Sequence, residues 1–236
     1  MKIKKLKILY FKVLPSILIS TGIVILLITF GPILLSELWY SLKVSGNKQI
    51  ILSDNLSLDN QAGGGQGSVF GGLLSATPTI ISPVNKDFSI IVEKIGINAP
   101  VVANVSVTDP KKYNEALKEG IAHALTSDYP SINPGNVYLF AHASLNFWDM
   151  GKYSTVFNLL RKLENKDKIH LFYNEKHFIY EVVGKEVYKG WNTYPISRPV
   201  IEPILTLQTC DPPGTTLNRM VITARLINYN DPELAE

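Results

Sequence analysis

Cysteine is almost absent from the sequence, since Cys210 is the single cysteine among 236 residues. A disulfide bond within the chain is therefore excluded. No internal repeat is present, and no basic patch interleaved with aromatic residues points to a nucleic-acid partner. The lone thiol ends the run 205–210, where a strand-like pattern meets a turn, and this position favours a thiol that takes part in chemistry.

Acidic residues are absent from the first 36 positions, whereas five lysines fall within residues 1–12. Residues 13–36 carry no charged side chain, and as a helix these 24 residues would be about 36 Å long, enough to cross about 30 Å of hydrocarbon. Positive charge before a span keeps that end in the cytoplasm. We therefore predict a cytoplasmic basic tail (1–12), one transmembrane helix (13–36) and an extracellular remainder, which places the protein in the cell membrane.

A cleaved signal peptide is the alternative interpretation of this apolar segment. The segment is longer than the apolar part of a typical signal peptide, and no Ala-x-Ala-like cleavage site follows it. An uncleaved anchor is therefore the favoured interpretation. Without its five lysines, 18 basic residues remain against 20 acidic ones, so the exported part is nearly neutral.

Residues 37–85 are typical of a linker, because glycines at 63–65, 67, 71 and 72 lie among Ser, Asn and Asp with little hydrophobic periodicity. A flexible chain of this length would reach roughly 35–40 Å from the membrane. The alternative is that the hydrophobic pairs Val69-Phe70 and Leu73-Leu74 dock on the following domain and regulate access to it.

Residues 86–236 make one domain-sized segment of 151 residues, mostly short β-branched runs separated by turn signals. Segments 109–119 and 153–163 have apolar residues at helical spacing, and Asp109 before Pro110 predicts a capped helix start. Many strands and few helices predict a mostly β fold, a closed or partly closed barrel with short helices outside it. The predicted strands cover residues 88–92, 99–102, 137–141, 169–173, 177–183, 204–209 and 220–227.

Strand alternation places Cys210 with Gln208 and Thr206 on the more polar face of its run. Arg219 lies on the more polar face of the next run, and the turn-rich link between the two runs suits an antiparallel return. Side chains directly opposite on such strands have Cβ atoms about 5 Å apart. A guanidinium at this range can stabilise a thiolate or a developing oxyanion, and the alternative is a solvated strand arginine.

A cysteine nucleophile also needs an acid–base partner, because a free thiol is mostly protonated at pH 7. Among the four histidines, His142 ends the most continuously apolar strand run and would stand at a barrel rim, so it is the first candidate. His123, beyond the first predicted helix, is the second. His170 and His177 bracket a hairpin-like turn and are expected to be structural or solvated.

The motifs around these residues resemble those of sortases, the membrane-anchored cysteine transpeptidases of bacterial surfaces. Residues 206–210, Thr-Leu-Gln-Thr-Cys, resemble the family's T-L-x-T-C signature, and residues 219–224 and 135–142 resemble its arginine-bearing and histidine-bearing strands. With further similarity at 94–102 and 120–123, the resemblance extends over about residues 88–227. It implies a sortase-type closed β-barrel in which His142, Cys210 and Arg219 are catalytic and His123 is structural.

The resemblance also implies an activity, namely cleavage of a C-terminal sorting signal of the Leu-Pro-x-Thr-Gly type in secreted proteins. Cys210 would carry the acyl group as a thioester and pass it to an amine on the cell wall or on another surface protein. The expected partners are these proteins and acceptors, with no cofactor and no metal ion, and no substrate-binding residue is assigned. Two alternatives stay open: a membrane-anchored thiol peptidase that releases a free acid, and a catalytically inert surface-binding module.

Overall fold

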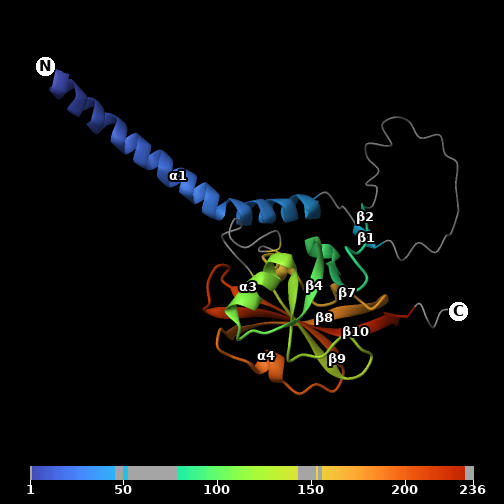
Figure 1. Cartoon of the computed structure of the whole chain (residues 1–236). Helices are drawn as coiled ribbons and strands as arrows, with labels where there is room; N and C mark the ends of the chain where they lie inside the picture. The colour runs from blue at the N-terminus through green and yellow to red at the C-terminus, as the bar shows by residue number, and fades with distance from the viewer. Residues whose placement is uncertain (1, 46–49, 53–78, 143–152, 154–155, 232–236) are drawn as a thin grey trace, which may run out of the picture.

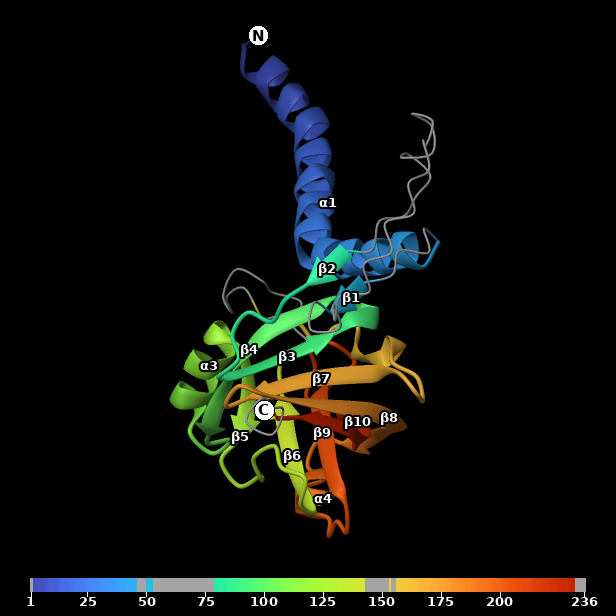
Figure 2. The same ribbon diagram turned by 90° about the vertical axis from the view of Figure 1, so that its right-hand side faces the viewer.

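Strands dominate the chain after residue 86. They are β3 (Phe88–Val92), β4 (Ile97–Val105), β5 (Ile121–Ala124), β6 (Gly135–Phe140), β7 (Lys168–Tyr173), β8 (Lys176–Lys189), β9 (Pro203–Asp211) and β10 (Asn218–Asn230). In the computed structural model they close into a barrel in the order β10–β8–β7–β3–β4–β5–β6–β9 (Figures 1 and 2). Neighbouring strands are antiparallel except for the parallel pairs β4–β5 and β6–β9. The structure describes residues 2–45, 50–52, 79–142, 153 and 156–231.

The barrel interior is filled by the apolar residues of alternating strand positions. Leu205 and Leu207 of β9 and Ile222 and Ala224 of β10 are all fully buried, which is the inward face that strand alternation predicts. Every predicted strand overlaps an observed one, so the predicted mostly β, closed barrel with short helices is confirmed.

The helices are only partly as predicted. The segment 109–119 forms α3 (Pro110–Glu119) with Asp109 as its N-cap, whereas the described residues of the segment 153–163 (153 and 156–163) form turns and one 3-10 helix, η3 (Leu160–Lys162). That helix prediction was wrong because four successive residues, 157–160, are buried, and a one-sided surface helix would leave a polar face exposed. The sequence patterns also missed β5, which is short and contains two alanines, η2 (Glu93–Ile95) and α4 (Tyr194–Ser197).

The apolar N-terminal segment lies within α1 (Lys2–Ser45), which has a bend in Figures 1 and 2. The helix contains the pair Gly31-Pro32, and a proline that removes a backbone donor is a common cause of bending. Several apolar side chains of α1 are exposed, among them Leu18 and Ile19. No helix in the described part of the chain is both long enough and apolar enough to cross a membrane. The transmembrane assignment of residues 13–36 stays a prediction.

The last part of α1 contacts the barrel through η3. The Glu37 carboxylate accepts a hydrogen bond from Arg161 and lies 3.0 Å from Nζ of Lys162. The Lys162 ammonium is also 5.3 Å from the centroid of the Tyr40 ring, which packs against the barrel core. These contacts join the end of the helix to the barrel.

Residues 37–85, predicted to be a linker, include the end of α1 and two short strands. The strands β1 (Ile50–Leu52) and β2 (Thr79–Ile81) pair in parallel. The hydrophobic pairs at 69–70 and 73–74, for which docking is the alternative, lie outside the described residues. The domain boundaries at 12, 36 and 85 stay predictions.

Two buried histidines lie on the β7–β8 hairpin. His170 and His177 are 5% and 8% exposed, and Nδ1 of His170 lies 3.0 Å from Nε2 of His177. The His177 ring stacks on Phe172 with 4.4 Å between ring centroids. Burial, with a smaller contribution from His177, lowers the pKa of His170 to about 4. Both histidines are therefore structural rather than solvated.

The burial of His170 predicts a loss of stability in mild acid. A histidine in the unfolded chain has a pKa near 6.5, so between pH 6.5 and pH 4 the unfolded state binds a proton that the folded state excludes. Above pH 6.5 the effect vanishes, and by pH 5 the free energy of unfolding should have fallen by about 2 kcal/mol. Chemical unfolding, followed by circular dichroism above pH 6.5 and again at pH 5, measures the fall in the free energy of unfolding. The free energy of unfolding of His170→Leu should fall less between these pH values. An equal fall in the variant and the wild type would contradict the role of His170 in the loss of stability.

Candidate active site

Cys210 and Arg219 lie directly opposite each other on the antiparallel strands β9 and β10. Nη1 of Arg219 lies 3.6 Å from the Cys210 Sγ, to which it donates a hydrogen bond, and 3.1 Å from the carbonyl oxygen of Asn218. β9 ends one residue after the cysteine and β10 begins one residue before the arginine, so both stand at one edge of the barrel. Both side chains are half-buried. The predicted pairing of thiol and guanidinium across the two strands is confirmed.

His142 reaches the same edge because β6 runs parallel to β9. Beyond the end of β6, the amide of Ala141 donates to the carbonyl of Gln208 at 3.2 Å. The hydroxyl of Thr209 donates to the carbonyl of Ala141 at 2.9 Å. Since Ala141 precedes His142 and Thr209 precedes Cys210, these bonds bring the histidine and the cysteine to neighbouring places in the barrel edge.

The environment of His142 suits proton transfer. Its side chain is half-buried, and burial lowers the pKa of His142, so the imidazole is neutral at pH 7 and able to accept a proton. The Tyr113 ring of α3 meets the imidazole edge-on, with 5.5 Å between centroids. A thiol, a neutral imidazole and a guanidinium at one edge supply a nucleophile, an acid–base group and a donor for an oxyanion, the set that acyl transfer needs.

His123, the second candidate, is fully buried on β5. Its Nε2 lies 3.0 Å from the carbonyl oxygen of Asp128 and 3.0 Å from the Ser127 hydroxyl, while the Asn104 amide donates to its Nδ1 at 3.5 Å. Burial lowers the pKa of His123. Both ring nitrogens are engaged in bonds that tie β5 to neighbouring segments, which is the arrangement of a structural histidine.

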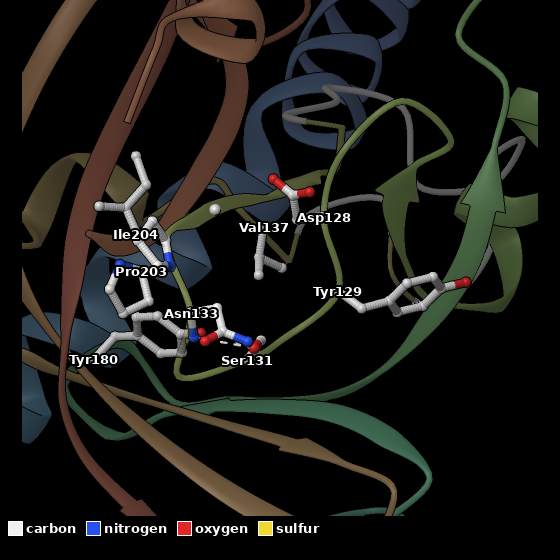
Figure 3. Close-up of a pocket in the computed structure, with 10 residues that line it drawn as sticks. Asp128, Tyr129, Ser131, Asn133, Val137, Tyr180, Pro203 and Ile204 are labelled. Carbon is white, nitrogen blue, oxygen red and sulfur yellow. Dashed lines mark hydrogen bonds between the residues drawn. The ribbon is translucent and has the colours of Figure 1, made fainter. Parts of the chain in front are cut away.

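A cavity of about 200 Å³ lies at the opposite end of β6 and β9, around Gly135 and Pro203 (Figure 3). The buried Tyr180 hydroxyl has no hydrogen-bond partner among the described residues. None of the three candidate catalytic side chains lines this cavity, so it is separate from the acyl-transfer groups. Within the described ranges, no cluster of three His, Cys, Asp or Glu side chains is arranged to hold a metal ion. The lining residues are Asp128, Tyr129, Ser131, Asn133, Pro134, Gly135, Val137, Tyr180, Pro203 and Ile204.

The sequence of the barrel matches a known protein family. The model of the sortase domain matches residues 90–227, more than half of the chain. The chain belongs to the sortase family. Sortases are cysteine transpeptidases, so the resemblance drawn from the sequence motifs is confirmed at the level of the family.

Solved structures similar to this sortase share its fold. Sortase C-1 from Actinomyces oris is 24% identical over 61% of this chain and 76% of that chain, with a TM-score of 0.51. The pilus-related sortase C of Group B Streptococcus is 24% identical over 61% and 69%, with a TM-score of 0.50. Sortase A from Corynebacterium diphtheriae is 20% identical over 63% of each chain, with a TM-score of 0.50. No curated protein sequence matches. Because sortases of types C and A both occur among these structures, the subclass is not assigned.

Side chains that the sequence patterns did not single out complete the polar face that leads to Cys210 of this sortase. Arg198, in the segment after α4, donates to the Thr206 hydroxyl at 3.1 Å, and the Tyr138 hydroxyl donates to the Gln208 carboxamide. Strand alternation grouped Thr206 and Gln208 with Cys210, but no sequence pattern indicated which side chains reach them. Their partners lie 8 and 70 residues away in the chain, so only the fold brings them together.

The two histidines of this sortase are expected to respond differently to alanine. His142→Ala should lower the rate of transpeptidation about 10²- to 10⁴-fold, the usual contribution of a general acid–base, with little change in melting temperature. His123→Ala should instead lower stability by about 1–3 kcal/mol, because it leaves buried partners unsatisfied. Rates per folded enzyme and thermal unfolding of both variants make the comparison. An active His142→Ala enzyme beside a well-folded but inactive His123→Ala enzyme would reverse the two roles.

Proposed function

We propose that this sortase cleaves a C-terminal sorting signal in secreted proteins and transfers the acyl group to an amine, with Cys210, His142 and Arg219 as its catalytic residues. The observation that carries the assignment is the cross-strand pair at the barrel edge, where the Arg219 guanidinium donates to the Cys210 sulfur at 3.6 Å. The bonds of Ala141 to β9 support the place of His142 beside this pair.

Acylation begins when the Cys210 thiol gives its proton to the neutral imidazole of His142 and Sγ attacks the scissile carbonyl carbon. The carbonyl oxygen gains negative charge, which the guanidinium of Arg219 stabilises. The C–N bond then breaks, and the imidazolium of His142 gives its proton to the departing amine. The product is a thioester between the substrate's new C-terminal carbonyl and Cys210.

Transfer reverses the proton movements with a new amine. His142, neutral again, takes a proton from the incoming amine as the amine nitrogen attacks the thioester carbonyl. Arg219 stabilises the second oxyanion, the C–S bond breaks, and the proton returns to the cysteine sulfur. Water is the competing nucleophile, so the fate of the acyl group depends on how well the site keeps water away from the thioester.

Our proposal places the barrel on the outer side of the cell membrane, held by residues 13–36. The supporting observations are the five lysines within residues 1–12, the uncharged run that follows them, and the continuous helix α1 that contains both. The proposed partners are secreted proteins with sorting signals and amine acceptors in the cell wall or on surface proteins. An enzyme and a substrate held at the same surface meet at a raised effective concentration, which compensates for weak peptide binding.

The proposed function is tested by the products that the full chain makes from a peptide of the Leu-Pro-x-Thr-Gly type. With an added peptide that has a free amino terminus, mass spectrometry should find a new amide between the acyl fragment and the added amine. Without the amine, slow release of the free acid is expected. A thiol peptidase would give the free acid in both reactions, and an inert binding module would leave the peptide intact.

A further inference from the structure

Tyr113 is held by α3 where that helix meets the catalytic edge of the barrel. The helix start is capped by Asp109, whose carboxylate accepts from the amides of Lys111 and Lys112 at 3.1 and 3.2 Å. Leu117, one helical turn after Tyr113 and on the same face, is 1% exposed in the barrel core. The capped start and the buried leucine together place the tyrosine ring at a defined position.

The Tyr113 ring contacts Phe140, the last residue of β6, and His142, two residues further along the chain. It stacks on Phe140 with 5.4 Å between centroids and 12° between planes, and it meets His142 edge-on at 5.5 Å and 77°. Both are arrangements that aromatic rings prefer. Because Phe140 is only 4% exposed, it forms a buried support for the tyrosine ring. The imidazole therefore has an ordered aromatic neighbour on one side.

The hydroxyl end of Tyr113 lies within electrostatic range of the other two catalytic side chains. Burial, and to a smaller extent an electrostatic contribution from Cys210, raises the pKa of Tyr113 to about 12, while Arg219 acts in the opposite direction. The hydroxyl is therefore protonated at neutral pH. Tyr113 thus contacts the histidine of the site and lies within electrostatic range of Cys210 and Arg219.

We propose that Tyr113 is a positioning residue of the transpeptidation site, whose ring keeps the His142 imidazole in the orientation for proton transfer and excludes water from that side of the thioester. The ring is the essential part, because both contacts with the end of β6 are ring contacts. This role rests on the proposed function. Loss of the ring should slow acylation and transfer, and should let water compete better with the amine.

Three variants of the full chain separate positioning from packing. Tyr113→Ala removes the ring, and Tyr113→Phe keeps it without the hydroxyl. Tyr129→Ala is the matched control, because the Tyr129 ring lies 4.7 Å from His123 and stacks on Tyr173 at 5.1 Å. Like Tyr113, Tyr129 is half-buried, and it stands beside His123, the histidine to which we assign a structural role. If the alanine variant does not fold, Tyr113→Leu replaces it, since leucine keeps a large apolar side chain without an aromatic ring.

The kinetic readouts are kcat, KM for the sorting-signal peptide and the ratio of free acid to amide product. Tyr113→Ala should lower kcat about 10- to 100-fold, as expected for a misplaced catalytic group, with KM within about two-fold of the wild type and a larger share of free acid. Tyr113→Phe should stay within about three-fold of the wild type in kcat. Tyr129→Ala should have a lower melting temperature than the wild type, but the same kcat per folded enzyme.

A second readout does not depend on activity, namely the titration of the His142 imidazole followed by NMR. Removing the Tyr113 ring exposes His142, so in Tyr113→Ala its pKa should rise toward the ordinary value, whereas Tyr113→Phe and Tyr129→Ala should leave it unchanged. An unchanged titration, or an unchanged kcat and product ratio, in Tyr113→Ala overturns the proposal. If the wild type forms no thioester, the proposed function fails separately, and the titration alone decides the role of Tyr113.

Discussion

Replacing Cys210 with alanine is expected to reduce turnover of a sorting-signal peptide to the uncatalysed background, a loss of about 10⁴-fold or more. The chain has no second cysteine that could take over as the nucleophile. The fold should be unaffected, because the side chain is half-buried at the end of β9 and the register of β9 with β10 depends on backbone bonds. The measurement is the initial rate of product formation by mass spectrometry, with circular dichroism to confirm folding.

Cys210→Ser is the matched control for this prediction. Serine keeps the shape of the side chain but offers a hydroxyl, a much weaker nucleophile than a thiol. If the residue only packs at the barrel edge, serine should restore the rate. If it carries the acyl group, the serine variant should be nearly as inactive as alanine. Substantial activity in either variant would remove Cys210 from the mechanism.

Arg219→Lys is expected to lower kcat about 10²- to 10³-fold, the usual cost of losing an oxyanion donor. Lysine keeps the positive charge, but its ammonium lacks the planar geometry of the guanidinium, whose Nη1 donates both to Sγ and to the Asn218 carbonyl. The loss should appear in kcat more than in KM, because the oxyanion exists only during the reaction. Steady-state kinetics with the sorting-signal peptide and a saturating amine make the measurement.

Arg225→Lys gives the control for charge and strand position. Arg225 lies on the same strand and face as Arg219, but it is half exposed and faces the Glu181 carboxylate at 3.9 Å. A surface ion pair of this kind contributes little to stability, so this variant should have close to wild-type kinetics. Full activity in Arg219→Lys would contradict the oxyanion role, and an equal loss in both variants would point to a general effect of arginine replacement.

The barrel and the pairing of Cys210 with Arg219 were predictable, because both follow from a period of two along the strands. Alternation separates the inward Leu205 and Leu207 from the outward Gln208 and Cys210, and a short turn-rich link implies an antiparallel return. His142 was favoured by its place at the end of an apolar run and was assigned by the motif resemblance. The parallel pairing of β6 with β9, which no local pattern shows, puts it beside the cysteine.

Contacts between elements that are distant in the chain could not be predicted. Tyr113 has the spacing of a core-facing helical residue, and nothing in the sequence indicates that α3 packs its ring on Phe140 and His142. The segment 153–163 has helical spacing, but its apolar residues are buried on several sides, and tertiary packing overrides the local preference. The short strand β5 depends on its partners β4 and β6 rather than on its own residues.

The central claim, that Cys210 carries the acyl group, is tested most directly by the intact mass of the full chain mixed with a sorting-signal peptide in the absence of amine. We expect a mass increase equal to the acyl fragment, located at Cys210 by fragmentation and absent in Cys210→Ala. Adding an amine should release the acyl fragment from Cys210 and yield the amide between the fragment and the amine. Cleavage of the peptide without any adduct, or an adduct on a different residue, would contradict the account.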